Sequence, residues 1–85
     1  MASTTYEGWK NRGTWNCALW INNEYPLYVR AQEFMRMYKG NDPYRQYIRW
    51  LGLEEERTPD GFKWLGTRLS FKELDIMMWE LRPEL

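Results

Sequence analysis

Apolar side chains recur at helical spacing along most of this chain. The clearest repeat is bounded by Pro26, whose fixed φ suits a first helical turn, and by Gly40, a residue type that commonly ends helices. Its apolar positions follow the spacing i, i+4, i+7, i+8 and i+11 and are Leu27, Ala31, Phe34, Met35 and Tyr38. This spacing predicts an amphipathic helix over 26–40 that buries one face.

A shorter helix is predicted before it. Asn11 and Thr14 are both good N-cap residues, and the pair Asn22-Asn23 is expected to end the helix after Ile21. The positions in between are apolar on nearly all sides, with Trp15, Ala18 and Leu19 on one face and Cys17, Trp20 and Ile21 elsewhere. Such a helix is either surrounded by neighbours or presents a surface to a partner.

A third helix is predicted from Asp42, an N-cap residue followed by proline, to Gly52. Its inward face holds Tyr44, Tyr47, Ile48 and Leu51. Beyond it, Thr58-Pro59-Asp60-Gly61 has the composition of a turn. Residues 62–69 fit both a short helix and an extended segment, and we favour a helical turn that ends at Gly66.

A fourth helix is predicted before Pro83. Ser70 and Glu73 have the spacing of a capping box, and the buried face that follows holds Phe71, Leu74, Met77, Met78 and Leu81. Because no pair of alternating β runs occurs, the expected fold class is all-α, a small single-domain bundle of about four helices with short connections. We expect residues 1–8 to form a flexible tail and residues 9–85 to form the one helical domain.

The composition argues against catalysis. None of the 85 residues is histidine, the usual general base and the commonest metal ligand. Ser3, Ser70 and the single cysteine, Cys17, therefore have no histidine to activate them, and Cys17 is expected to be a small buried hydrophobe. The run Glu54-Glu55-Glu56 is typical of a solvated connection. We expect no enzyme activity, no metal and no cofactor.

Charge is balanced overall but not along the chain, since twelve Lys and Arg face twelve Asp and Glu. Residues 1–50 carry seven cations and four acids (+3), whereas residues 51–85 carry five cations and eight acids (−3). Such a split suits docking to a charged protein or antiparallel self-association. An alternative is weak nucleic-acid binding by the basic face of residues 30–49, which comprises Arg30, Arg36, Lys39, Arg45 and Arg49. A solvated helix face also explains these residues.

Aromatic residues make up 18% of the chain. Trp20, Trp50 and Trp79, together with Ile76, lie off the main apolar faces of their predicted helices. Tryptophan is enriched among the residues that dominate protein interfaces. The alternative is a core of several layers that covers a helix on two sides.

The most distinctive segment reads Tyr6-Glu7-Gly8-Trp9-Lys10-Asn11-Arg12-Gly13-Thr14-Trp15-Asn16-Cys17-Ala18-Leu19-Trp20-Ile21-Asn22-Asn23. It resembles the opening of a small family of uncharacterised proteins found in bacteriophages, including those of cyanobacteria, and in some bacteria and archaea. In that family a Trp-x-Asn-Arg-x-Thr-Trp-Asn core precedes a short Leu-Trp helix. Residues 69–74 resemble the family's closing helix. The resemblance implies a phage-like context and no catalytic activity.

The motif has two physical interpretations. As a fold-defining cap, Trp9 would pack on the first helical turn as a hydrophobic staple, and Asn16 would bond a neighbouring loop backbone. As a recognition surface, it would present Asn11, Arg12, Asn16 and Trp20 to a partner. Adding the two later tryptophans gives the full predicted partner-binding set, which is Asn11, Arg12, Asn16, Trp20, Trp50 and Trp79.

The sequence therefore predicts a non-enzymatic accessory protein of phage type that binds and modulates a host protein, or a second copy of itself as a homodimer. Nucleic acid is the alternative partner. No apolar run reaches the 18 residues or more of a membrane span, and the N-terminus lacks a basic and then apolar signal region. We expect no membrane partner and a cytoplasmic location, in the host cell if the protein is phage-encoded, consistent with the unpaired cysteine.

Overall fold

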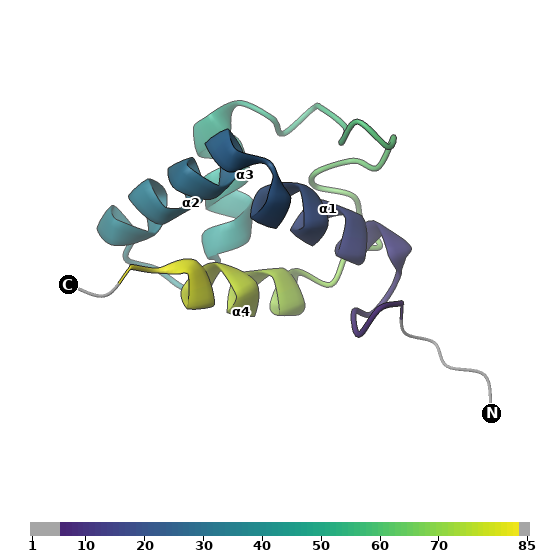
Figure 1. Cartoon of the computed structure of the whole chain (residues 1–85), viewed down its shortest axis with the longest axis horizontal. Helices are drawn as coiled ribbons and strands as arrows, with labels where there is room; N and C mark the ends of the chain where they lie inside the picture. The colour runs from purple at the N-terminus through teal and green to yellow at the C-terminus, as the bar shows by residue number, and fades with distance from the viewer. Residues whose placement is uncertain (1–5, 84–85) are drawn as a thin grey trace.

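The computed structural model describes residues 6–83, which contain four helices. These are α1 (Arg12–Asn23), α2 (Tyr25–Met37), α3 (Pro43–Leu51) and α4 (Phe71–Leu81). In Figure 1, α4 runs beneath α1 and α2 while α3 crosses behind α2, and the connection from α3 to α4 arches away and returns beside the first half of α1. The predicted all-α bundle is confirmed.

One core joins the four helices. It includes two fully buried tyrosines, Tyr44 and Tyr47, whose hydroxyls donate to the carbonyl oxygens of Trp64 and Leu27 at 2.6 Å. Because each hydroxyl has an acceptor, both rings are buried without leaving an unsatisfied donor. Around them lie Ile21, Ala31, Met35, Ile48, Trp64, Leu74 and Met78.

Two predicted helix boundaries are confirmed. The Asn11 side chain caps α1, since its Oδ1 accepts from the backbone N–H of Thr14 at 2.9 Å. Gly52 ends α3 in the left-handed conformation, with φ of 76°, and its N–H bonds back into the last turn. At both positions, a local feature of the sequence is sufficient to set the boundary.

The ends of α1 and α2 differ from the prediction. Asn22 and Asn23 continue α1, because their Nδ2 atoms donate to the carbonyls of Ala18 and Leu19 one turn back, at 2.9 and 3.0 Å. α2 ends at Met37 and not at Gly40. The chain leaves α2 at Tyr38, and the side chain of Tyr38 closes the connection to α3.

Tyr38 closes this connection through two hydrogen bonds to Asp42. Its hydroxyl donates to Asp42 Oδ1 at 2.9 Å and accepts from the Asp42 backbone N–H at 3.0 Å. Asp42 occupies the predicted N-cap position of α3, but its side chain makes no capping bond. Its carboxylate instead accepts from Tyr38 and, at 3.3 Å, from Gln46 Nε2. The hydrogen bonds from Tyr38 and Gln46 hold the pKa of Asp42 below its ordinary value.

The predicted capping box of α4 forms only by half. The backbone N–H of Glu73 donates to Ser70 Oγ at 3.3 Å, as expected. The Glu73 carboxylate, however, accepts from the backbone N–H of Lys10 at 2.7 Å and does not reach back to Ser70. The Ser70 N–H donates instead to Thr14 Oγ1 at 2.9 Å. Both departures tie the start of α4 to the start of α1.

The connection over 53–70, here called the 53–70 segment, contains no helix. The turn predicted to end at Gly66 is present as one hydrogen-bonded turn, in which the Gly66 N–H donates to the Lys63 carbonyl at 3.3 Å, and it does not extend into a helix. The turn at 58–61 is confirmed, with the Gly61 N–H donating to the Thr58 carbonyl at 2.8 Å. Beyond it, Trp64 N–H donates to the Glu56 carbonyl at 3.2 Å, and Arg57 pairs with Lys63 in an isolated bridge. These backbone groups bond across the segment, so they cannot form a local helix.

Residues 6–9 form a tight turn, where a flexible tail was predicted as far as residue 8. Tyr6 and Trp9 exchange backbone hydrogen bonds of 2.6 and 2.7 Å, and both central residues, Glu7 and Gly8, have positive φ (51° and 87°). The Tyr6 ring meets the Trp15 ring edge-on at 4.9 Å. The rest of the predicted tail, residues 1–5, lies outside the described residues. None of the helices within 6–83 has the length and apolar character needed to span a bilayer.

Candidate functional site

Four aromatic rings form a continuous row whose two ends are exposed, here called the aromatic face. Phe34 lies 5.4 Å from Trp50 and 5.1 Å from Tyr38, and Tyr38 lies 6.1 Å from Trp79, measured between ring centroids. Phe34 is buried, whereas Trp50 is 44% and Trp79 37% exposed. Met37, from the last turn of α2, is 65% exposed. Phe34, Trp50 and Trp79 lie on α2, α3 and α4, so three helices contribute rings to this row.

An arginine lies at each end of the aromatic face. The Arg30 guanidinium carbon is 6.0 Å from the centroid of Trp50, and that of Arg82 is 6.0 Å from the centroid of Trp79. Both distances are within the range of a cation–π contact. Tryptophan, tyrosine, methionine and arginine are the side chains enriched in protein interfaces.

The predicted partner-binding residues of the N-terminal motif are used mostly inside the protein. Asn11 caps α1 and also donates from Nδ2 to the Arg68 carbonyl at 2.7 Å. Asn16 is 2% exposed and donates from Nδ2 to Asp60 Oδ2 at 2.8 Å, and its Oδ1 is buried with no partner among the described residues. Trp20 Nε1 donates to the same Asp60 oxygen at 2.9 Å. Only Arg12 remains exposed and outside this set of hydrogen bonds.

The partner-binding set is therefore divided. Asn11, Asn16 and Trp20 hold the 53–70 segment against α1, as the cap interpretation requires, although Asn16 bonds a side chain and not the expected loop backbone. Trp50 and Trp79 lie in the aromatic face, which does not include Trp20. One acceptor, Asp60, binds both Asn16 and Trp20, and the sequence indicated only that it is a turn residue. The hydrogen bonds from Asn16 and then Trp20 hold the pKa of Asp60 below its ordinary value, with a smaller contribution from the charge of Arg12.

The basic residues of 30–49 differ in exposure and in surroundings. Arg45 is half-buried with its guanidinium carbon 4.0 Å from the Phe71 ring centroid. Burial raises the pKa of the nearby Asp75, and the charge of Arg45 only partly opposes this rise. Arg30 lies at the edge of the aromatic face, while Arg36, Lys39 and Arg49 are exposed. Tyr44 and Tyr47, which lie on the same helix as Arg45 and Arg49, are fully buried and cannot stack on a base. Among the described residues, the aromatic rings that contact these cations and keep some exposure are Trp50, beside Arg30, and Phe71, beside Arg45.

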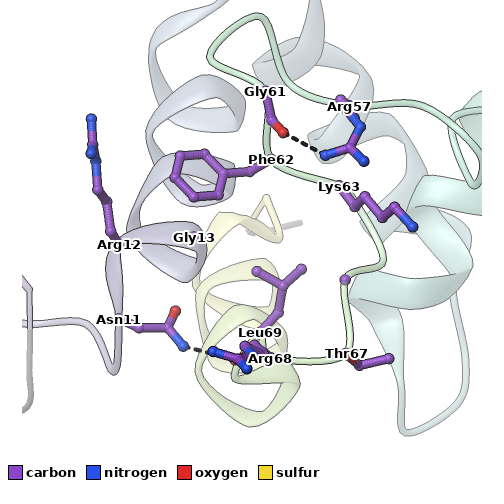
Figure 2. Close-up of a pocket in the computed structure, with 11 residues that line it drawn as sticks. Asn11, Arg12, Gly13, Arg57, Gly61, Phe62, Lys63, Thr67, Arg68 and Leu69 are labelled. Carbon is purple, nitrogen blue, oxygen red and sulfur yellow. Dashed lines mark hydrogen bonds between the residues drawn. The ribbon is translucent and has the colours of Figure 1, made fainter.

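A cavity of about 470 Å³ lies between the first turn of α1 and the 53–70 segment, and we call it the α1 cavity. Figure 2 shows Phe62 and Leu69 near its centre with the basic side chains around them. The cavity is lined by Asn11, Arg12, Gly13, Arg57, Gly61, Phe62, Lys63, Gly66, Thr67, Arg68 and Leu69. Four of these residues are cationic and none is acidic.

Sequence reasoning missed the α1 cavity because three of its four cations, Arg57, Lys63 and Arg68, belong to the half of the chain whose net charge is negative. The one available signal was Gly13. A Cβ at this position would lie 3.3 Å from both Leu69 Cδ2 and Phe62 Cδ1. A glycine therefore allows the 53–70 segment to approach α1 closely.

Cys17 is the remaining reactive group, and it is buried as predicted. Burial raises the pKa of its thiol to about 11, so the thiol is protonated at neutral pH and is a poor nucleophile. Its Sγ lies 3.8 Å from the Lys63 carbonyl oxygen. Within residues 6–83, no group of three or more Cys, Asp or Glu side chains is placed to hold a metal ion.

Comparison with known proteins identifies the family. The chain matches a family of unknown function, DUF7249, over residues 2–84, and it belongs to that family. No curated protein matches it. No solved structure matches it.

Proposed function

We propose that this member of the DUF7249 family is a non-enzymatic accessory protein that binds another protein through the aromatic face. One observation carries the proposal: two exposed tryptophans, Trp50 and Trp79, are joined by Phe34 and Tyr38 into one row that ends in an arginine on each side. The phage-like context of the N-terminal motif makes a host protein the proposed partner.

The exposed area of Trp50 and Trp79 is large enough to contribute to binding. A tryptophan offers up to about 250 Å² of contact area, so the exposed part of each indole is about 100 Å². Removing that area from water contributes about 2.5 kcal/mol per residue at 25 cal/mol per Å². Two such residues are sufficient to act as the dominant contacts of a small interface.

The rings are also pre-ordered. Phe34 is buried and packs on Trp50 and Tyr38, so the row is fixed from the inside before any partner arrives. Ordering side chains is one of the main costs of association, and a pre-ordered surface avoids most of it. The positions of Arg30 and Arg82 favour a partner that offers an apolar patch with carboxylates at its two ends.

Affinity capture from host lysate tests the proposal with matched variants. We expect a protein retained by the wild type to be lost with Trp50→Ala and with Trp79→Ala, each checked for helical content by circular dichroism. Tyr25→Ala is the control, because Tyr25 is an aromatic residue of α2 that is 76% exposed and lies outside the aromatic face. Capture that survives both tryptophan substitutions, or that is lost equally with Tyr25→Ala, would contradict the proposal.

Sedimentation of the same variants distinguishes self-association from binding to a host protein. A wild-type dimer at micromolar concentration that becomes monomeric with Trp50→Ala would make a second copy, and not a host protein, the occupant of the aromatic face. A wild-type monomer under these conditions is the result that we expect.

A further inference from the structure

The α1 cavity has features that the proposed function does not use. We infer that it binds a nucleotide unit, with phosphate held by its arginines and the base lying against Phe62. The inference depends on residues other than those of the aromatic face, so it can hold or fail independently of protein binding. Three properties of the cavity carry it: charge, an accessible aromatic ring, and walls that are already fixed.

The charged side chains that line the α1 cavity are all cationic. Arg12, Arg57 and Arg68 are exposed and line the cavity, and among the described residues none of the three donates a hydrogen bond to a carboxylate. Arg57 Nη1 donates to the Gly61 carbonyl at 2.8 Å, which holds its guanidinium at the cavity wall. Guanidinium groups bind phosphate oxygens with directed, charge-assisted hydrogen bonds. Three of them around one cavity therefore favour a phosphorylated ligand.

Two neighbouring features limit the charge that the cavity offers. Lys63 also borders a second cavity of about 390 Å³ with Glu54 and Glu55, so its charge is shared. Asp60 lies close enough to Arg12 for the arginine to lower its pKa. That carboxylate, however, accepts from Asn16 and Trp20 and is not among the residues that line the cavity. The three arginines remain the principal charges.

The aromatic ring is that of Phe62. It is half-buried, and the Arg12 guanidinium carbon lies 5.8 Å from its centroid. Figure 2 shows the ring among the lining side chains, between Arg12 on one side and Arg57 on the other. Aromatic side chains beside cations are the usual way to bind a base and its phosphate without reading sequence. A planar base on Phe62 would bring its phosphate to the arginines.

The walls are fixed by hydrogen bonds on both sides of the cavity. Asn11 Nδ2 bonds the Arg68 carbonyl at 2.7 Å, Ser70 N–H bonds Thr14 Oγ1 at 2.9 Å, and Asn16 bonds Asp60 at 2.8 Å. A cavity that is already formed needs little reorganisation when its ligand enters. Its volume of about 470 Å³ falls in the range typical of small-molecule sites. This volume exceeds what an inorganic anion needs and suits a nucleotide.

Titration of the ¹⁵N-labelled full chain tests the inference, with ADP, inorganic pyrophosphate and the oligonucleotide (dT)8 as probes at about 50 mM salt, where phosphate contacts are strong. We expect ADP to shift the amide resonances of Gly13, Gly61 and Gly66 and to bind more tightly than pyrophosphate. If (dT)8 shifts the same resonances, the nucleotide unit can belong to a strand. If only ADP does, the ligand is a free nucleotide. Both results support the site.

Substitutions in the α1 cavity test which side chains contribute to ADP binding. Arg12→Gln and Arg68→Gln should each weaken ADP binding about tenfold. Phe62→Leu should weaken ADP binding while leaving pyrophosphate binding unchanged, which separates stacking from charge. The control is Arg36→Gln with Lys39→Gln, which removes two exposed cations outside the cavity and should leave ADP binding unchanged.

Three outcomes would overturn the inference. The first is the absence of any shift with ADP or (dT)8 at up to about 5 mM ligand. The second is a wild-type affinity for pyrophosphate equal to that for ADP, which would leave Phe62 without a role. The third is an equal loss of binding in the Arg36→Gln, Lys39→Gln control, which would indicate a diffuse electrostatic attraction.

Discussion

The helical core and the 53–70 segment are held together by different interactions. The core is formed by closely packed apolar side chains from all four helices, such as Met35, Ile48 and Leu74, all of which are fully buried. Of the apolar side chains in the 53–70 segment, only Trp64 and Leu69 are buried. The segment is attached to α1 mainly by polar side chains.

This difference has an energetic consequence. Burial of a large apolar side chain contributes about 1.5–3 kcal/mol, whereas a typical hydrogen bond contributes about 1 kcal/mol net. The core therefore has many large contributions, whereas the 53–70 segment has two, from Trp64 and Leu69, and otherwise smaller ones from hydrogen bonds. Regions with few buried apolar contacts open locally at lower free energy than the core. We expect the segment, and with it the α1 cavity, to open without unfolding the helices.

The largest effect is expected from a substitution in the core. Leu74→Ala leaves a cavity among fully buried side chains and should lower the free energy of unfolding by about 2–5 kcal/mol, measured by urea denaturation. Ile76→Ala, on the same helix but 49% exposed, should cost less than about 1 kcal/mol. Equal losses for the two variants would contradict the placement of the core.

An intermediate effect is expected where the two regions meet. Thr14 is fully buried, and its hydroxyl accepts from Ser70 N–H at 2.9 Å and donates to Asn11 Oδ1 at 2.6 Å. Thr14→Val keeps the shape but leaves the Ser70 N–H without an acceptor, which should cost about 1–3 kcal/mol in urea denaturation. Thr67→Val, at an exposed position, is the control and should change stability by less than about 0.5 kcal/mol. A Thr14→Val variant as stable as the wild type would show that this contact does not hold the segment.

The smallest effect is expected on the pKa of Asp60. The pKa of Asp60 lies below its ordinary value of 3.8, so the contact with α1 contributes stability above that pH and loses it as the pH falls through the lowered pKa. Asn16→Ala removes the first of the two donors and should raise the Asp60 pKa toward 3.8, as measured by carboxyl ¹³C NMR. Asn22→Ala, on the same helix but without contact to Asp60, should leave it unchanged. An unchanged pKa in Asn16→Ala would contradict the hydrogen bond.

The two regions also differ in how far the sequence predicts them. The apolar stripe of α2, the cap at Asn11 and the stop at Gly52 depend on residues within a few positions of each other, and all three were predicted. The contact between Asn16 and Asp60 joins residues 44 positions apart, and that between Asn11 and Arg68 joins residues 57 apart. No local pattern reports such pairs.

Local patterns also predicted only part of the candidate sites, because they do not report contacts between residues far apart in the sequence. Helical spacing placed Trp50 and Trp79 off the main apolar faces, and both are exposed in the structure. Trp20 was placed with them by the same rule, but its indole bonds Asp60, which the spacing could not anticipate. The α1 cavity draws its cations from residue 12 and from residues 57–68, so its charge became visible only when the fold brought these residues together.

Native-state hydrogen exchange of the wild type and of Leu74→Ala tests most directly whether the two regions are independent. We expect the substitution to accelerate exchange of core amides such as those of Met35 and Ile48 by at least about 30-fold, in proportion to the lost stability. The amides of Thr58, Phe62 and Ser70 should exchange through local opening at an unchanged rate. Acceleration of these three amides by the same factor as the core would show that the segment opens only with the whole fold, and would contradict the account.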